Sequence, residues 1–357
     1  MKNRIKKVKD IINEAEFDSL LIDSDVNRFY LTNFTGSAGR VLFTPENEYF
    51  ITDFRYTEQA ANQTDGFKIV ELNKDVVESI NDILQRDGTE KLGFEAKTVN
   101  YYQYGKYDEK FKDIELISTE DLIKDVRMIK EENEIEMIKK AIEISDKAYE
   151  HILDFIEVGM TEKEVALELE IFQKKLGGSK NAFDFIVASG KRSSMPHGVA
   201  SDKVINENEL ITLDFGTFYK GYCSDMTRTF VLGKANKKQK EIYNKVLEAQ
   251  LAVIDKIKAG MSGVEADKIA RDIIEDAGYG DNFGHGLGHG IGVEVHEGPN
   301  VSYKSEDDLK ENSIVTDEPG IYIKDWGGVR IEDDLLITKD GCEVLNSSPK
   351  ELIEVSI

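Results

Sequence analysis

Residues 210–225, LITLDFGTFYKGYCSD, place an acid inside an apolar strand. The stretch begins with four residues typical of a buried strand, and Asp214 then stands where another apolar residue would be expected. A turn at Lys220-Gly221 brings the chain back to Asp225, which predicts a hairpin. A carboxylate in an apolar strand is unfavourable unless it is paired, hydrogen-bonded or bound to a metal. Because the two carboxylates would lie close together and repel each other, a cation between them is the simplest remedy.

A related hairpin is encoded by residues 311–337, ENSIVTDEPGIYIKDWGGVRIEDDLLI. When the two stretches are aligned, Glu318 falls on Asp214, and Glu332 falls on Asp225 after a slightly longer turn. Two related hairpins that face each other would bring four carboxylates to one point.

The helices before the hairpins repeat as well. The sequence IEVGMT at 156–161 matches IKAGMS at 257–262, and each is followed by a capping box and by apolar residues at helical spacing. The region from about 130 to 340 is therefore predicted to be one fold unit used twice.

Four of the five histidines lie in two short stretches. His197 belongs to SSMPHG, and His285, His289 and His296 belong to HGLGHGIGVEVHEGP. Every even position from 284 to 292 is glycine, which argues against a helix and for an extended segment that another part of the chain approaches closely. In an extended segment His285 and His289 share a face. The helical HExxH zinc motif is therefore excluded.

One imidazole and four carboxylates form an oxygen-rich set of candidate metal ligands. Such a set suits Mn²⁺, Mg²⁺, Fe²⁺ or Co²⁺ better than the sulfur-rich sites of structural zinc. Four carboxylates also balance the charge of two divalent ions. The physical interpretation is a two-metal site that acidifies a bridging water into a nucleophile. The candidate ligands are Asp214, Asp225, His289, Glu318 and Glu332.

These residues, in this order and in these contexts, resemble the pita-bread metallopeptidases, a family that includes methionine aminopeptidase, aminopeptidase P and prolidase. The motifs that carry the resemblance are SSMPHG, LDFG with GYCSDMTRT, GHGLGHGIG, DEPGIY and VRIEDD. It implies an α+β catalytic domain at 124–357, built from a duplicated helix-helix-hairpin unit. It also implies two divalent metal ions, for which we expect manganese, with cobalt, zinc or iron as alternatives.

The resemblance also assigns roles to the candidate ligands. Asp214 would chelate one ion, Asp225 and Glu332 would bridge both ions, and His289 with Glu318 would complete the other. Glu318 would also shuttle the proton.

Four further residues are predicted to act at the site. His197 and His296 would stabilise the tetrahedral intermediate and position the substrate, and His285 would contact the residue after the scissile bond. The alternative is that His285 and His296 are structural histidines. Arg330 would hold a carboxylate by a bidentate pair, either with a catalytic role or as a simple ion pair.

Residues 1–123 predict an α/β domain of short strands and amphipathic helices. Its glycine loop, FTGSAG at 34–39, lacks the lysine and the spacing of a phosphate loop, so nucleotide binding is not expected. FTGSAG and DFRYTEQA at 53–60 resemble the N-terminal domain of aminopeptidase P and prolidase. Methionine aminopeptidase lacks that domain, so its presence shifts the expected function towards Xaa-Pro peptides.

Composition limits the partners and the location. The chain has 357 residues, which suggests two domains, and a formal net charge of −23, which makes nucleic acid or an anionic membrane an unexpected partner. No apolar run is long enough to cross a bilayer, and the N-terminus does not read as a signal peptide. Cys223 and Cys342 give no disulfide framework, so we expect a cytoplasmic protein. A homodimer is expected from the resemblance alone.

The leading functional hypothesis is an Xaa-Pro aminopeptidase, which removes the first residue of small peptides when proline is second. The alternative enzyme is prolidase, which cuts only Xaa-Pro dipeptides. A third hypothesis, from another class, is a non-catalytic binding module on the same fold. The five intact ligand positions argue against that module.

Overall fold

The computed structural model describes residues 2–357. The chain divides into two compact units, one ending at Arg127 and the other beginning at Met128. The boundary that the sequence predicts, between residues 123 and 124, falls inside helix α6 (Leu122–Met128). In the described part of the chain, no helix combines the length and the hydropathy that a membrane span requires.

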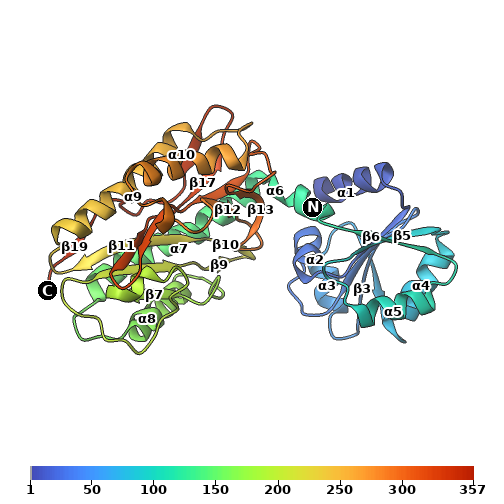
Figure 1. Cartoon of the computed structure of the whole chain (residues 1–357). Coiled ribbons are helices and arrows are strands. Elements are labelled where there is room, and N and C mark those ends of the chain that lie inside the picture. Colours follow the sequence, from blue (N-terminus) through green and yellow to red (C-terminus); the bar gives the residue numbers. More distant parts are fainter. Residues whose placement is uncertain (1) are drawn as a thin grey trace. The chain divides into compact units, whose positions relative to one another are not determined.

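The first unit is an α/β domain, as predicted. Its sheet has six strands, with helices packed around it (Figure 1). In spatial order the strands are β4 (Lys68–Glu71), β3 (Glu48–Thr52), β2 (Arg40–Phe43), β1 (Ser19–Ile22), β5 (Lys91–Glu95) and β6 (Glu115–Thr119). The helices before α6 are α1 (Lys2–Glu14), α2 (Asp25–Thr32), α3 (Thr57–Gln63), α4 (Val76–Arg86) and α5 (Tyr101–Lys110).

The second unit contains the predicted duplication. Its first half has helices α7 (Glu132–Phe155) and α8 (Glu162–Lys175) and the 3₁₀ turn η1 (Gly190–Ser194). The sheet order is β19 (Glu354–Val355), β11 (Met226–Leu232), β8 (Leu210–Phe215) and β7 (Ile186–Ser189). The short pair β9 (Phe218–Tyr219) and β10 (Tyr222–Cys223) extends the hairpin between β8 and β11.

The second half repeats this plan. Its helices are α9 (Lys237–Lys256) and α10 (Gly263–Asp276), followed by the 3₁₀ turn η2 (Gly280–Asn282). The sheet order is β13 (Glu297–Val301), β12 (Gly288–Gly290), β14 (Ile314–Asp317), β17 (Asp333–Ile337) and β18 (Cys342–Val344). The hairpin between β14 and β17 is extended by β15 (Gly320–Ile323) and β16 (Gly327–Arg330).

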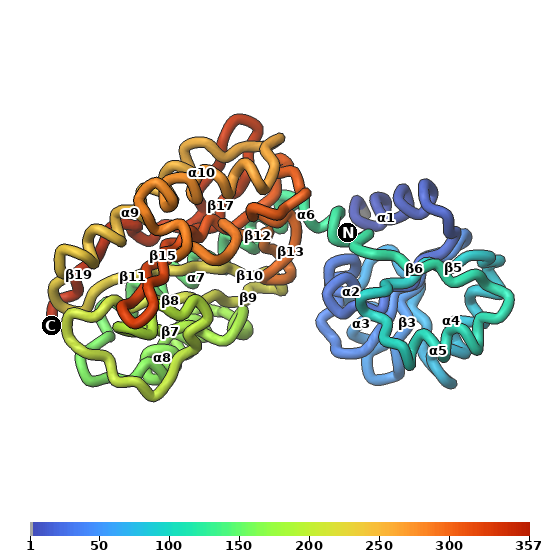
Figure 2. Tube along the Cα trace, viewed as in Figure 1, coloured from blue at the N-terminus to red at the C-terminus, as the bar shows by residue number. Residues whose placement is uncertain are grey.

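Matching local signals build the two halves. Helix α8 begins with a capping box between Thr161 and Glu164, and helix α10 begins with one between Ser262 and Glu265. Each helix pair buries its apolar stripe against its own sheet, which gives two separate hydrophobic clusters. The tube in Figure 2 shows the helices on the outside of this unit and the two hairpins between them. Contacts of β16 with β8 and β11 place the two hairpins next to each other.

Two glycines allow the strands to approach closely at this point. A Cβ atom at Gly216 would lie 1.9 Å from the carbonyl oxygen of Ser224, on the returning arm of the same hairpin. A Cβ atom at Gly288 would lie 2.1 Å from the carbonyl oxygen of Thr316. Since real Cβ contacts are never this short, only glycine lets these backbones pack as they do.

Candidate active site

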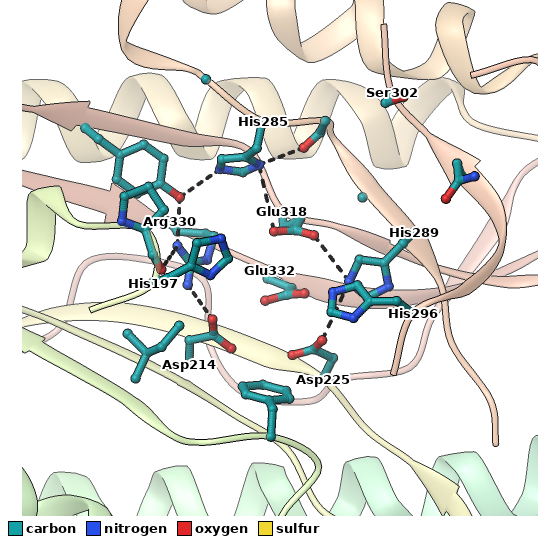
Figure 3. Close-up of a pocket in the computed structure, with 18 of the residues that line it drawn as sticks. His197, Asp214, Asp225, His285, His289, His296, Ser302, Glu318, Arg330 and Glu332 are labelled. Atoms are coloured by element: carbon teal, nitrogen blue, oxygen red, sulfur yellow. Dashed lines mark hydrogen bonds and ion pairs between the residues drawn. The ribbon is translucent and has the colours of Figure 1, made fainter. Parts of the chain in front are cut away.

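A cavity of about 1100 Å³ lies within the second unit, between the two hairpins. Figure 3 shows the side chains that point into it. All nine residues that the sequence predicts for the site line this cavity: His197, Asp214, Asp225, His285, His289, His296, Glu318, Arg330 and Glu332. The remaining histidine, His151, lies elsewhere and stacks on Phe172, with ring centroids 3.9 Å apart.

Backbone hydrogen bonds between distant segments fix the positions of the acids. The amide of Glu332 donates to the carbonyl of Thr227, at 3.0 Å, and so ties the second hairpin to the first. The amide of Glu318 donates to the carbonyl of Leu287, at 2.9 Å, and so ties the end of β14 to the glycine-rich segment. The ligand positions are thus set by sheet register rather than by mobile loops.

Three of the predicted ligands form a tight group. Asp225, His289 and Glu332 each offer one ligand atom, and these atoms lie within 4.8 Å of one another. The Nε2 atom of His289 is 3.7 Å from a carboxylate oxygen of Asp225 and 3.5 Å from one of Glu318. Glu318 therefore joins the same cluster. Asp214 lies at the cavity wall beside it, where its Oδ2 atom forms an ion pair with Arg330 (Figure 3).

The chemistry of this donor set fits a metal ion. The Oδ1 atoms of Asp214 and Asp225 are buried and accept no hydrogen bond within the described structure. A buried carboxylate oxygen without a donor is unfavourable, and a bound cation satisfies it. The five residues Asp214, Asp225, His289, Glu318 and Glu332 would hold the metal.

The pKa shifts of the predicted ligands also fit a metal site. Burial, followed by the charges of neighbouring carboxylates, raises the pKa of both Asp225 and Glu332 well above the ordinary range. Burial also raises the pKa of Asp214, although the positive charge of Arg330 opposes the shift. Burial lowers the pKa of His289 to about 4, which keeps the imidazole neutral, as a metal ligand must be.

Two threonines that sequence reasoning missed orient the acids. The hydroxyl of Thr227 donates to Glu332 at 2.5 Å, and the hydroxyl of Thr316 lies 3.3 Å from Glu318. Thr316 also accepts the backbone amide of His289, at 3.0 Å. A signal was present in the sequence for Thr316, which lies two residues before Glu318, the acid that it contacts. There was none for Thr227, because Glu332 is 105 residues away from it in the sequence.

The contacts of Arg330 differ from the bidentate pair that the sequence predicts. It does not form a bidentate pair, because only its Nη2 atom contacts the carboxylate of Asp214. Its Nε atom donates to Thr227 at 2.9 Å, and its Nη1 atom donates to the hydroxyl of Tyr322 at 2.7 Å and to the carbonyl of Pro196 at 3.3 Å. The remaining donors are thus occupied by groups of the protein, and a single nitrogen is left for the acid.

The three histidines outside the ligand set lie around the cluster. The His296 ring lies 4.2 Å from the ring of His289. The His197 side chain lines the same cavity (Figure 3). His285 contacts Tyr322, with 2.9 Å between Nε2 and the hydroxyl. All three therefore face the cavity, and the ring nitrogens of His285 have protein partners.

Comparison with protein-family models identifies the chain. Residues 136–339 match the model of metallopeptidase family M24, and residues 4–129 match the creatinase/prolidase N-terminal domain. The chain belongs to metallopeptidase family M24. The family resemblance and the two-domain fold that the sequence predicts are therefore confirmed, and the chain is a metal-dependent hydrolase.

Relatives of this M24 metallopeptidase match over its whole length. An Xaa-Pro dipeptidase of Pyrococcus furiosus is 42% identical, over 99% of this chain and 100% of the relative. The solved structure of an Xaa-Pro dipeptidase from Bacillus anthracis has a TM-score of 0.97 and 48% identity, covering 100% of this chain and 99% of the other. The crystal structure of an X-Pro aminopeptidase from Thermotoga maritima has a TM-score of 0.91 and 39% identity, covering 97% and 99%.

Membership of family M24 implies divalent metal ions at the cluster. When bound, such ions polarise a carbonyl group and lower the pKa of a water molecule to near neutrality. The protein supplies the negative charge that binds them, through carboxylates of which two, Asp214 and Asp225, each have one buried oxygen without a donor. It also supplies the neighbouring histidines that can donate hydrogen bonds to a substrate.

Proposed function

We propose that this chain is an Xaa-Pro dipeptidase, a prolidase that hydrolyses the bond before proline in dipeptides. The observation that carries the proposal is full-length similarity to Xaa-Pro dipeptidases, at 42% identity in sequence and with a TM-score of 0.97 in structure. The sequence alone favours an Xaa-Pro aminopeptidase, with prolidase as the alternative. The relatives favour that alternative.

The residues of the cavity have distinct proposed roles. Glu318 faces the cavity with 18% of its side chain exposed, and it takes a proton from the attacking water and passes it to the leaving nitrogen. His197 and His296 line the same cavity and donate hydrogen bonds to the oxygen that becomes negatively charged. Asp225, His289 and Glu332 are the central metal ligands. For the metal we propose manganese, since the donor set is rich in oxygen.

A dipeptidase must also recognise the carboxylate that follows proline, and the cavity offers one candidate. Its lining contains two permanent cations, Lys304 and Arg330, and Arg330 is engaged by Asp214. Lys304 is exposed and forms no ion pair with any described residue, and its Nζ atom lies 5.0 Å from the ring centroid of Tyr303. We assign Lys304 to the substrate carboxylate because a free ammonium group is a suitable partner for it.

The aminopeptidase remains the second candidate, because the Thermotoga maritima X-Pro aminopeptidase has the same fold at 39% identity. The non-catalytic binding module has no comparable support, since the chain is a member of a peptidase family with its acidic cluster intact. The cytoplasmic location and the homodimer stay predictions from the sequence and the resemblance.

A substrate series tests the proposal. Enzyme reconstituted with manganese is assayed with an Xaa-Pro dipeptide, with the same dipeptide amidated at its C-terminus, and with an Xaa-Pro-Xaa tripeptide. A dipeptidase should cleave the free dipeptide and leave the tripeptide nearly untouched. Lys304→Met should raise KM for the free dipeptide by roughly 10-fold and leave the amide unchanged, since an ion pair that binds substrate and transition state equally affects KM alone. Comparable kcat/KM for dipeptide and tripeptide would contradict the proposal in favour of the aminopeptidase.

A further inference from the structure

We propose that Glu162 is a positioning residue of this active site: its buried carboxylate holds both ends of the segment 189–201, which carries His197. The inference rests on the proposed function for the role of His197, and one of its two tests needs no substrate. Glu162 is the first residue of α8, and its side chain is 0% exposed. It does not line the cavity, whereas His197 does.

Donors from three residues of the segment converge on the Glu162 carboxylate. Its Oε1 atom accepts the backbone amide and the hydroxyl of Ser189, both at 2.9 Å. Its Oε2 atom accepts the backbone amide of Ser201 at 3.1 Å and the hydroxyl of Ser201 at 2.6 Å. The guanidinium of Arg192 forms an ion pair with the same oxygen. Because hydrogen bonds to an ionised acceptor are the strong ones, Glu162 fixes the chain both before and after His197.

Arg192 extends this hold to the neighbours of His197. Its Nη2 atom donates to the carbonyl oxygen of Val199, two residues after the histidine, at 2.9 Å. Its own carbonyl oxygen accepts the amide of Met195, two residues before the histidine, at 2.8 Å. Since these bonds lie on both sides of His197 in the chain, the direction of the imidazole depends on the ion pair between Arg192 and Glu162.

The middle of the segment is attached to the second hairpin. The hydroxyl oxygen of Ser193 accepts the backbone amide of Gly328, at 2.8 Å, and the same hydroxyl donates to the carbonyl of Gly190, at 2.7 Å. Gly328 belongs to β16, which carries Arg330 at its end. The segment is therefore held by α8 at its two ends and by β16 between them, and His197 reaches the cavity from this fixed turn.

The duplication shows that the fold itself does not require this acid. Helices α8 and α10 follow aligned N-cap residues, Thr161 and Ser262, and each N-cap residue forms a β-bridge with the returning chain of its own half. The next residue is Glu162 in the first half and Gly263 in the second. A Cβ atom at Gly263 would lie 2.3 Å from the carbonyl oxygen of Asn300, so the second half has no room for a side chain there. The same unit is thus built without an acid at this place, which indicates that Glu162 serves the segment of His197.

Glutamine at this position should loosen the segment while keeping the size of the side chain. An amide has only one acceptor oxygen, so its nitrogen would face donors of Ser189 or of Ser201 and Arg192. A small misplacement of a group at the reacting centre can lower a rate by about 100-fold. Glu162→Gln should therefore lower kcat for an Xaa-Pro dipeptide by roughly 10- to 100-fold, with KM within about threefold of wild type.

A double-mutant cycle with His197→Ala separates positioning from a general structural effect. If Glu162 acts through His197, adding Glu162→Gln to His197→Ala should lower kcat by less than about twofold further. Full multiplication of the two single losses would overturn the proposal. A kcat in Glu162→Gln alone within about twofold of wild type would overturn it as well.

Asp146→Asn is the matched control. Asp146 is also buried, at 8% exposed, and its carboxylate also accepts the backbone amides and the hydroxyls of two serines, Ser347 and Ser348. None of these three residues lines the cavity. Asp146→Asn should lower Tm, as Glu162→Gln should, but leave kcat within about twofold of wild type.

Hydrogen exchange followed by mass spectrometry tests the hold on the segment without any substrate. In Glu162→Gln, the amides of 189–201 should exchange roughly 10-fold faster than in wild type or faster still, because bonds to a charged acceptor are lost there. In Asp146→Asn, exchange should accelerate at 347–348 and stay unchanged at 189–201. Unchanged exchange at 189–201 in Glu162→Gln would contradict the proposed hold.

The two tests also keep this inference apart from the proposed function. If wild-type enzyme cleaves no Xaa-Pro peptide, the proposed function fails, and hydrogen exchange still decides whether Glu162 holds the segment. If Glu162→Gln does not fold, Arg192→Gln replaces it in both tests, since it removes the link from Glu162 to Val199. The same results are then expected, and the same results would overturn the proposal.

Discussion

Replacing Glu332 with glutamine should change stability in opposite directions with and without metal. Glu332 is buried, and its ligand atom lies within 4.8 Å of those of Asp225 and His289. Two unit charges at that distance repel by about 3.5 kcal/mol at an effective dielectric constant near 20. Burial and the nearby carboxylates raise the pKa of Glu332, so partial protonation already relieves some of this repulsion in the wild type. Without metal, Glu332→Gln should therefore be as stable as wild type or more stable, by up to about 3 kcal/mol.

With manganese bound, Glu332→Gln should be less stable than wild type. A ligand that binds only the native state adds about 2.7 kcal/mol of stability when its free concentration is a hundred times its Kd. Glutamine removes a charged ligand atom, so manganese should add much less stability to the variant. For a unit of this size, each kcal/mol corresponds to roughly 2–4 °C in Tm. Thermal melts of chelator-treated protein, followed by a manganese titration, measure both quantities.

The neighbouring acid provides the control. Asp333 and Arg228 form an ion pair of 2.7 Å in which neither side chain is exposed. Removing one partner of a buried pair typically costs about 3–5 kcal/mol. Asp333→Asn should therefore lower Tm with and without manganese and keep the manganese-induced shift. A metal-free Glu332→Gln that melts below wild type and retains the full manganese shift would refute the assignment of this acid to a cation site.

Three further predictions concern the same cavity. Burial raises the pKa of Glu318 from an ordinary value of 4.5 to about 8, so the native state binds the proton more tightly than the unfolded state does. The stability of the metal-free protein should therefore fall as the pH rises from 4.5 to 8. Thermal melts at saturating manganese should not show this pH dependence. His197→Ala should lower kcat on the order of 100-fold, while calorimetry shows manganese affinity within about threefold of wild type. Gly288→Ala should destabilise the protein by about 1–3 kcal/mol in denaturant melts, since its Cβ would collide with Thr316, whereas Gly284→Ala, with no heavy atom within 4 Å, should not.

The sequence predicted the residues around the cavity because two independent signals coincide. The duplicated hairpin places acids at matching positions, and the histidines are concentrated next to glycines. Each signal is local, and both depend only on strand alternation and turns. An extended segment was predicted over 284–292, and within it Gly288–Gly290 forms strand β12, whose register shifts between His289 and Gly290.

The contacts of Arg330 could not be predicted in the same way. They join Asp214, Thr227 and Tyr322, and the closest of these in sequence is eight residues away. Which of these groups the Arg330 guanidinium contacts depends on how the two hairpins pack against each other, and the sequence pattern does not give that packing. The sequence favoured the aminopeptidase, whereas the relatives favour the dipeptidase; the motifs cover the ligands and not the part of the cavity lining that contains Lys304.

The duplication itself separates what the fold requires from what the site requires. In the alignment of the two hairpins, Tyr322 falls on Phe218 and Arg330 falls on Cys223. Both aromatic rings are buried, so the hairpin needs a ring at this position in each half. The hydroxyl and the guanidinium occur in the second half only, where they bond to each other and to His285 and Asp214. Since Phe218 serves the first hairpin without a hydroxyl, the same ring should serve the second, and Tyr322→Phe should lower activity while the fold is kept.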